Sequence, residues 1–148
     1  MVIVKELARH ILRRPVVGIA AAAKTPDGAW LLVRRADTGT WALPGGTLEW
    51  GETFRACIAR EMAEEAGVDR CEIVRVVGVY SDPARDPRFH AVTVLVECRI
   101  DAPGRDPSNP LEITEVRAFP ESDLPGPLAL GMSDMLRDAI LAKSVSIE

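Results

Sequence analysis

The stretch from Gly46 to Val68 constrains the fold more than any other, because it predicts one helix with an interruption of regular structure on each side. Just before it, the run Pro44–Gly46 cannot easily continue regular structure. Glu52–Ala66 has the pattern of a helix, and Gly67 occupies the position that glycine commonly takes after a helix end. The sequence therefore predicts a loop, a helix and a second loop in this part of the chain.

Segments on both sides of this helix have the patterns of β-strands. Val16–Ala23 is the longest apolar run of the chain and is predicted to form a buried strand. Thr25–Gly28 is a turn that leads to a second strand at Trp30–Arg34, so these two strands are expected to form a hairpin. Further strands are predicted at Ile73–Tyr80, Ala91–Ile100 and Ile113–Phe119.

Helices are predicted at both ends of the chain. Apolar residues at helical spacing indicate a short helix that begins near Val4, runs to Arg13 and stops before Pro15. A second amphipathic helix is predicted over Met132–Ile140, with Ser133 near its start. The fold class is therefore α/β, more closely α+β, with a mixed sheet sandwiched between helices. A length of 148 residues favours one domain over residues 1–148.

Composition and charge exclude several classes of function. A net charge of −4 without a run of Lys or Arg argues against nucleic-acid binding, and the longest apolar run is far too short to cross a membrane. The three cysteines form no CxxC pair, so neither a disulfide framework nor a zinc site is expected. Charged residues near the start leave no apolar core for a signal peptide. These features predict a cytoplasmic protein.

Three carboxylates gather on one face of the predicted helix. Glu61, Glu64 and Glu65 fall within an arc of about 100°, since each helical residue turns by about 100°. Carboxylates so close raise one another's pKa unless a cation lies between them, and such oxygen ligands suit Mg²⁺ or Mn²⁺ rather than zinc. Arg60 and Glu52 project from similar faces, and Arg60 can orient a carboxylate through two hydrogen bonds. The cluster taken alone fits a solvated, Glu-rich surface helix as well as a metal site.

The complete spacing resembles the signature of the Nudix hydrolases. That 23-residue box is matched at every fixed position by Gly46, five residues, Glu52, seven residues and then the run Arg60–Val68. The similarity extends more loosely through Trp41–Gly46 and Leu124-Pro125. The resemblance implies a mixed sheet between helices, in which the box forms a loop, a helix and a loop. It also implies hydrolysis of a diphosphate bond with the help of a divalent cation.

The resemblance further implies roles for individual residues. The metal ligands would be Gly45, through its backbone carbonyl, and the side chains of Glu61, Glu64 and Glu65. Glu52 and Arg60 would position these ligands, so that Glu52, Arg60 and Glu64 are all candidates for catalytic residues. Water activated by Mg²⁺ or Mn²⁺ would attack phosphorus, because the cation neutralises phosphate oxygens and lowers the pKa of bound water.

The general base lies outside the box in many members of this family. Glu97 projects from the polar face of its predicted strand, while Val94 and Val96 share the opposite face. Glu112 and Glu115 lie near the loop that follows this strand. Glu97 and Glu112 are therefore candidates for the base. Glu97 is alternatively a metal ligand or an exposed strand residue, and a surface position is the alternative for Glu112 and Glu115.

The loop after the third predicted strand bears on the choice of substrate. Pro83 follows Val68 by fifteen residues, an offset that resembles the ADP-sugar pyrophosphatases of the family. The run Tyr80–Arg88 resembles the corresponding loop of bacterial and archaeal ADP-ribose hydrolases. Phe89 and Ala118 depart from the pattern of these relatives, because glycine and an aromatic residue are common at the two positions.

Five side chains are candidates for contact with the substrate: Arg34, Trp41, Arg85, Arg88 and His90. The three in this loop could meet the phosphates or a terminal ribose, since Arg matches phosphate geometry. The alternative is a turn closed by salt bridges among the Asp and Arg residues of the loop itself. Arg34 and Arg35 end a strand that runs toward the box, and either could reach a phosphate or stay at the surface. Trp41 could stack on a base or pack against the protein.

These features predict an enzyme that hydrolyses a nucleoside diphosphate linked to another moiety, with ADP-ribose or a related nucleotide sugar as the first choice. The alternatives are a hydrolase of (deoxy)nucleoside triphosphates or dinucleoside polyphosphates, and a non-catalytic, nucleotide-binding regulatory module. The expected partner is a small-molecule nucleotide, with neither nucleic acid nor membrane. A homodimer is left open, because the apolar stripe in Val4–Ile11 could pack on the sheet or pair with a second copy.

Overall fold

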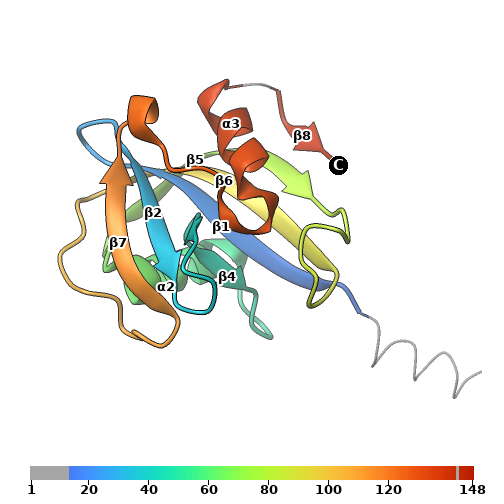
Figure 1. Ribbon diagram of the computed structural model, residues 1–148. Helices are drawn as coiled ribbons and strands as arrows, with labels where there is room; N and C mark the ends of the chain where they lie inside the picture. Colours follow the sequence, from blue (N-terminus) through green and yellow to red (C-terminus); the bar gives the residue numbers. More distant parts are fainter. Residues whose placement is uncertain (1–13, 143) are drawn as a thin grey trace, which may run out of the picture.

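Two long parallel strands, β1 (Val16–Lys24) and β6 (Ala91–Ile100), form the middle of the sheet in the computed structural model, which describes residues 14–142 and 144–148 (Figure 1). They are in register over nine residue pairs. β5 (Cys71–Tyr80) runs antiparallel to β6, and β8 (Ser146–Ile147) lies parallel to β5 at the edge. The N-terminal helix predicted up to Arg13, with its apolar stripe, lies outside the described residues.

On its other side, β1 has two successive neighbours. It pairs antiparallel with β2 (Trp30–Arg35) through only two residue pairs next to the turn, which confirms the predicted hairpin. Farther along, β1 pairs with β4 (Gly45–Thr47), whereas β2 pairs with β3 (Trp41–Ala42) and β7 (Ile113–Phe119). The sheet therefore divides where β1 and β2 separate.

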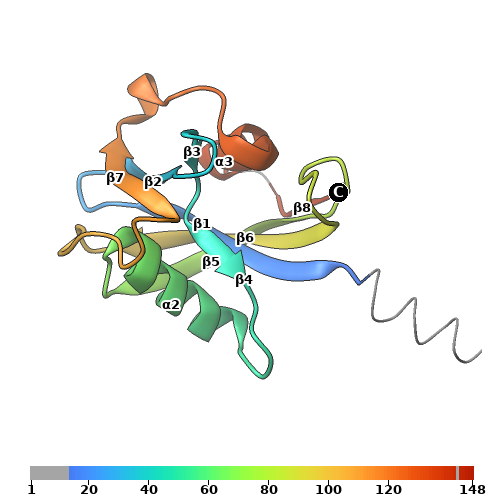
Figure 2. The same ribbon diagram turned by 60° about the horizontal axis from the view of Figure 1, so that its bottom comes forward.

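A helix covers each face of the sheet. α2 (Phe54–Ala66) lies on one face and α3 (Met132–Ile140) on the other (Figure 2). Their buried anchors are Ile58 and Met62 from α2 and Met135 and Leu136 from α3. Complete burial of one such side chain contributes about 1.5–3 kcal/mol, so both helices help to hold the sheet together. The predicted class, a mixed sheet sandwiched between helices, is confirmed.

α2 begins two residues later than predicted. Thr53 caps the helix, since its hydroxyl accepts a hydrogen bond from the N–H of Ala56 at 3.2 Å. Gly67 ends it in the left-handed conformation, with φ 63°, and its N–H donates to the carbonyl oxygen of Met62. Glu52 therefore lies before the helix, in the loop that leads into it.

The predicted break in regular structure is present at Pro44, between β3 and β4, but it does not include Gly45 and Gly46, which begin β4. They pair antiparallel with Ala20 and Ile19 of β1. A Cβ on Gly45 would lie 2.2 Å from the carbonyl oxygen of Ile19, which is far closer than any side chain permits. Glycine is therefore what lets β4 approach β1, and the same residue type that suggests a break allows a strand here.

The shortest elements were not predicted. β3 and β8 have two residues each, and the 3₁₀ helices η1 (Glu121–Asp123) and η2 (Ala129–Gly131) have three, so none is long enough to show a periodic pattern. α3 starts at Met132, as expected from its spacing. Across residues 14–142 and 144–148, no helix is both long enough and apolar enough to cross a membrane.

Candidate functional site

Two adjoining cavities open where β1 and β2 separate. The first, called here the apolar cavity, has a volume of about 150 Å³. Its side chains include those of Leu43, Tyr80, Leu130, Met132 and Met135. The second, called the acidic cavity, has a volume of about 640 Å³ and is lined by five acidic residues. They are Asp37, Glu49, Glu61, Glu65 and Glu112.

The two cavities form one cleft, because they share part of their lining. The shared residues are Arg35, Gly45, Gly46, Thr47, Glu65, Arg88, Phe89 and Ile113. Arg35 ends β2, and Arg88 lies in the loop between β5 and β6. The junction thus carries two guanidinium groups between an apolar chamber and a group of carboxylates.

Glu65 lies at this junction, on the last turn of α2. The backbone N–H of Gly45 donates to its Oε2 at 3.0 Å. Burial raises the pKa of the Glu65 carboxyl to about 7, and neither the Gly45 hydrogen bond nor the nearby Arg35 fully offsets that effect. Repulsion from Glu61 and Glu112 raises this pKa further. The protein alone therefore stabilises the charge of Glu65 poorly.

Arg60 gathers the other acidic residues of the box. Its Nε and Nη2 donate to the two carboxylate oxygens of Glu52 at 2.9 and 3.1 Å, and its Nη1 donates to Glu61 at 2.8 Å. The hydrogen bonds from Arg60 are the largest cause that lowers the pKa of Glu52 to about 2. Glu64 lies 3.4 Å from Nη1, and its side chain is 55% exposed. The expected contact between Glu52 and Arg60 is thus formed, and it brings Arg60 against Glu61.

Gly46 makes room for Glu61. A Cβ at this position would lie 2.0 Å from Oε1 of Glu61, so the carboxylate packs against bare backbone. Burial raises the pKa of Glu61, while the hydrogen bond from Arg60 opposes that rise. Glycine at this position therefore leaves space for one of the acidic side chains.

The donor set of the acidic cavity suits a hard divalent cation. Glu61 and Glu65 reach the same cavity as Gly45, and a nearby cation would let Glu65 ionise fully at neutral pH. Glu64 faces Arg60 and solvent instead. Within residues 14–142 and 144–148, no group of three or more His, Cys, Asp or Glu side chains is already assembled to hold a metal. A cation would therefore compete with Arg60 for Glu61 and with the Gly45 N–H for Glu65.

The two candidates for the general base lie on opposite faces of the sheet. Glu97 accepts a hydrogen bond from Arg75 at 2.7 Å, and Arg75 also donates to the carbonyl oxygen of Ala139 on α3. Glu97 is therefore on the α3 face, away from the glutamates of α2. Glu112 lines the acidic cavity together with Glu65. The structure thus brings Glu112 into the cleft and leaves Glu97 outside it.

The three candidate residues of the β5–β6 loop differ in their surroundings. Arg88 lines both cavities, and its Nε and Nη2 donate to the carboxylate of Asp86 at 2.9 and 2.7 Å. Arg85 lines the apolar cavity, but carboxylates from outside the loop engage its guanidinium. The ring of His90 lies 2.8 Å from the carbonyl oxygen of Ser81 and thus contacts its own loop. The alternative of salt bridges within the loop holds for Asp86 and Arg88.

Arg35, rather than Arg34, reaches the cleft. Successive strand residues point to opposite faces, so Arg35 lines both cavities while Arg34 donates to the carbonyl oxygen of Gly39 at 3.0 Å. Trp41 packs edge-on against Phe119, with ring centroids 4.9 Å apart, as its packing alternative expected. The candidate for substrate contact, Arg34, therefore lies outside the lining of the cleft, and its neighbour Arg35 lines both cavities. Which of the two faces the cleft depends on the pairing of β2 with β3 and β7.

Comparisons with known proteins identify the family of this chain. Residues 12–139 match the NUDIX domain. The chain is similar to an ADP-ribose pyrophosphatase of Methanocaldococcus jannaschii, 40% identical over 72 residues, which are 47% of this chain and 42% of that protein. It is also similar to a putative 8-oxo-dGTP diphosphatase of Mycobacterium tuberculosis, 33% identical over 101 residues, or 68% of this chain and 62% of that protein. The matches thus span about half the length of these relatives.

A solved structure is similar over almost the whole chain. It is an ADP-ribose pyrophosphatase from Streptococcus suis 89-1591, with a TM-score of 0.75 and 29% sequence identity. The similarity covers 91% of this chain and 100% of that one. The arrangement of sheet and helices described above is therefore shared along the full length of that protein.

Proposed function

This chain belongs to the NUDIX family, and we propose that it hydrolyses the diphosphate bond of ADP-ribose or a related nucleotide sugar with the help of Mg²⁺ or Mn²⁺. The observation that carries the proposal is the order of groups along the cleft. An apolar cavity, two arginines and a group of carboxylates follow one another. That order suits an apolar base, a charged diphosphate and the cation that its hydrolysis requires.

Arg35 and Arg88 are the diphosphate ligands in this proposal. In each arginine, Nε and Nη2 donate hydrogen bonds to a neighbouring carboxylate. The acceptor is Asp37 for Arg35 and Asp86 for Arg88. Among residues 14–142 and 144–148, no side chain or carbonyl accepts a hydrogen bond from Nη1 of either arginine. We propose that these Nη1 groups donate hydrogen bonds to the phosphate oxygens, since a carboxylate already orients each guanidinium.

The acidic cavity would hold the divalent cation. Its ligands in the proposal are the carbonyl of Gly45 and the carboxylates of Glu61 and Glu65, with Glu64 joining once it leaves Arg60. When bound, the cation neutralises phosphate oxygens and lowers the pKa of bound water. Arg60 offsets the repulsion among these carboxylates and fixes the direction of Glu61.

Glu112 is the proton acceptor that we assign to the reaction, because it shares the acidic cavity with Glu65. The oxygen of a water molecule forms a bond to phosphorus, and the proton of that water passes to Glu112. The bond between this phosphorus and the bridging oxygen breaks, and the bridging oxygen leaves with the other phosphate. ADP-ribose would then yield AMP and ribose 5-phosphate.

The relatives support two substrates to different degrees. Two proteins similar to this chain carry the name ADP-ribose pyrophosphatase, which favours a nucleotide sugar. The putative 8-oxo-dGTP diphosphatase favours the second candidate, hydrolysis of a nucleoside triphosphate. A non-catalytic binding module has less support, because the chain retains all the charged residues of the box. These are Glu52, Arg60, Glu61, Glu64 and Glu65.

A panel assay of the full chain with Mg²⁺ tests the proposal. The panel holds ADP-ribose, other nucleotide sugars, dinucleoside polyphosphates and (deoxy)nucleoside triphosphates, and chromatography resolves the products. Preference for ADP-ribose with release of AMP is the expected result. Preference for a triphosphate, with release of a monophosphate and pyrophosphate, would establish the second candidate instead. Binding of ADP-ribose without cleavage, even with Mn²⁺, would favour the regulatory module.

A further inference from the structure

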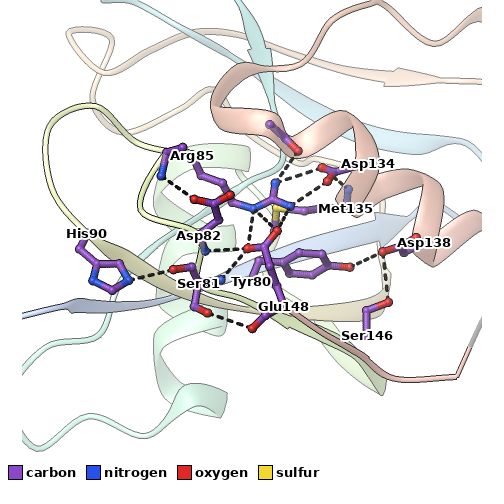
Figure 3. A network of polar contacts seen from close by, with 12 residues as sticks. Tyr80, Ser81, Asp82, Arg85, His90, Asp134, Met135, Asp138, Ser146 and Glu148 are labelled. Atoms are coloured by element: carbon purple, nitrogen blue, oxygen red, sulfur yellow. Dashed lines mark hydrogen bonds and ion pairs between the residues drawn. The ribbon is translucent and has the colours of Figure 1, made fainter.

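The protein itself engages every donor of the Arg85 guanidinium (Figure 3). Nη2 and Nη1 donate to the two carboxylate oxygens of Asp134 at 2.7 and 3.0 Å, and Nη2 and Nε donate to Glu148 at 2.7 and 3.0 Å. Nη1 also donates to the carbonyl oxygen of Gly131 at 2.9 Å. The guanidinium lies over the ring of Tyr80, 5.0 Å from its centroid. Since a guanidinium has five N–H donors, none is left for a phosphate.

On one side, these contacts fix the loop between β5 and β6. The carboxylate of Glu148, which follows β8, accepts hydrogen bonds from the backbone N–H groups of Ser81 and Asp82 at 2.8 and 2.7 Å as well as those from Arg85. Glu148 therefore holds the start of the loop and its middle at once, as Figure 3 shows. Arg88, three residues farther along the same loop, lines both cavities.

On the other side, the contacts hold a backbone in an unfavourable conformation. Leu130 has φ 54° and Gly131 has φ 68°, so two successive residues are left-handed. A side chain larger than hydrogen disfavours this conformation, which persists only where its surroundings maintain it. Arg85 does so through the carbonyl oxygen of Gly131, and a Cβ on Gly131 would lie 2.8 Å from Nη1 of Arg85. Leu130 and Met132, on either side of Gly131, line the apolar cavity.

The guanidinium of Arg85 is more sheltered than its two partners, Asp134 and Glu148, whose side chains are 40% and 32% exposed. The side chain of Arg85 is 15% exposed, and its two carboxylate partners come from α3 and from the segment after β8. Charge-assisted, two-pronged contacts of this kind restrict orientation more than single hydrogen bonds do. A change at either carboxylate should therefore alter segments that lie far from it in the sequence.

We propose that Arg85 is a positioning residue, which fixes the β5–β6 loop and the Leu130–Met132 segment as two walls of the apolar cavity against a bound nucleoside. The proposal rests on the proposed function for the presence of a nucleotide in this cleft. It replaces the expectation that Arg85 binds the substrate directly. Nucleotide affinity should then depend on Asp134 and Glu148, whose carboxylates face Arg85.

Steady-state kinetics with ADP-ribose and Mg²⁺ test the proposal. The variants are Glu148→Gln, Asp134→Asn and Arg85→Lys, and Arg105→Lys, at the exposed ion pair with Asp69, is the matched control. We expect the three variants to raise KM about tenfold and to leave kcat within about twofold, while the control behaves as the wild type. A tenfold loss of kcat at unchanged KM would overturn the proposal, because Arg85 would then act on the diphosphate itself.

Hydrogen–deuterium exchange of the same variants gives a readout that is independent of activity. Each of the three substitutions should speed amide exchange both in residues 82–90 and in residues 129–133. Faster exchange in only one of these two segments would overturn the proposal. Glu148→Gln is the mildest variant, since it keeps an acceptor for the backbone N–H groups, and it remains informative if Arg85→Lys fails to fold.

The two proposals fail in different ways. If the wild type prefers a nucleoside triphosphate, the proposed function is wrong, but the same KM and kcat comparison with that nucleotide still decides the role of Arg85, because it also carries a nucleoside. If the wild type cleaves nothing on the panel, the exchange experiment decides alone. Wild-type exchange rates in both segments of Glu148→Gln would then refute the positioning role.

Discussion

Glu52 and Glu65 are two carboxylates of one motif with opposite environments. Hydrogen bonds from Arg60 lower the pKa of Glu52 to about 2, whereas burial raises the pKa of Glu65 to about 7. Glu52 is therefore ionised at any physiological pH and serves to hold Arg60. The charge of Glu65 needs a further positive partner, which a cation in the acidic cavity would provide. In the proposed function, Glu52 is accordingly a positioning residue and Glu65 a metal ligand.

The raised pKa of Glu65 predicts how Mg²⁺ stabilises the protein. Without metal, the folded state holds a proton on Glu65 that the unfolded state has lost, so this group reduces stability as the pH rises from about 4.5 to about 7. In the proposed function, Mg²⁺ binds the ionised carboxylate, and its binding should remove that loss. The increase in Tm caused by Mg²⁺ should be larger at about pH 8 than at about pH 5.5. The dependence should vanish in Glu65→Gln, and an equal increase at both pH values would contradict the prediction.

The position of the general base is open to a paired test. Glu112→Gln should lower kcat by about 100-fold, because Glu112 lines the acidic cavity. Glu97→Gln is the matched control on the other face of the sheet. It should leave kcat unchanged and cost at most about 1 kcal/mol of stability through the weakened contact with Arg75. A loss of kcat in Glu97→Gln alone would reverse the assignment.

At the scale of elements, β4 links the sheet to α2. Its first residue pairs with β1 and donates its N–H to Glu65, and its second leaves space for Glu61. A three-residue strand thus sets both the edge of the cleft and the place of two acidic side chains. Short elements of this kind carry little pattern in the sequence, although the glycines that permit them are visible there.

The two glycines of β4 should respond differently to substitution by alanine. Gly45→Ala places a Cβ 2.2 Å from the carbonyl oxygen of Ile19, which is backbone and cannot move aside, so we expect a loss of at least about 2 kcal/mol of stability. Gly46→Ala meets the end of the Glu61 side chain at 2.0 Å, and that carboxylate can rotate away. Denaturant unfolding should therefore show the larger loss for Gly45→Ala, and Gly46→Ala should lose activity beyond its loss of stability. Equal unfolding energies would contradict this account.

At the scale of the whole molecule, the layers could be predicted from the sequence but the cleft could not. Periodic patterns gave α2, α3 and the long strands close to their observed bounds. In β6, however, Val94 and Leu95 pack into the cores on opposite faces, because a helix covers each side of the sheet. Alternation along the sequence therefore assigns residues to two faces of a strand, but it does not show which face lies toward the acidic cavity. Glu97 lies on the face of β6 that α3 covers, away from the glutamates of α2. In the same way, the pairing of β2 decides whether Arg34 or Arg35 reaches the cleft.

The cleft forms where two strands of the sheet separate, and no local sequence pattern predicts that separation. β1 and β2 separate after two residue pairs, and each then takes a different partner strand. Residues from the box, from the end of β2 and from the β5–β6 loop meet only because of this separation. Phe89 lines both cavities for the same reason, although in the sequence it was only a departure from the pattern of relatives.

The central claim, that this cleft is the centre of a metal-dependent diphosphate hydrolase, is tested most directly by ADP-ribose turnover in Glu65→Gln. The wild type with Mg²⁺ should release AMP and ribose 5-phosphate. The variant should lose at least about 100-fold in kcat while its metal-free Tm stays equal or rises, since glutamine keeps the Gly45 hydrogen bond without a buried charge. Glu72→Gln, on β5 and outside the lining of both cavities, is the control and should behave as the wild type. Full activity of Glu65→Gln would contradict the account.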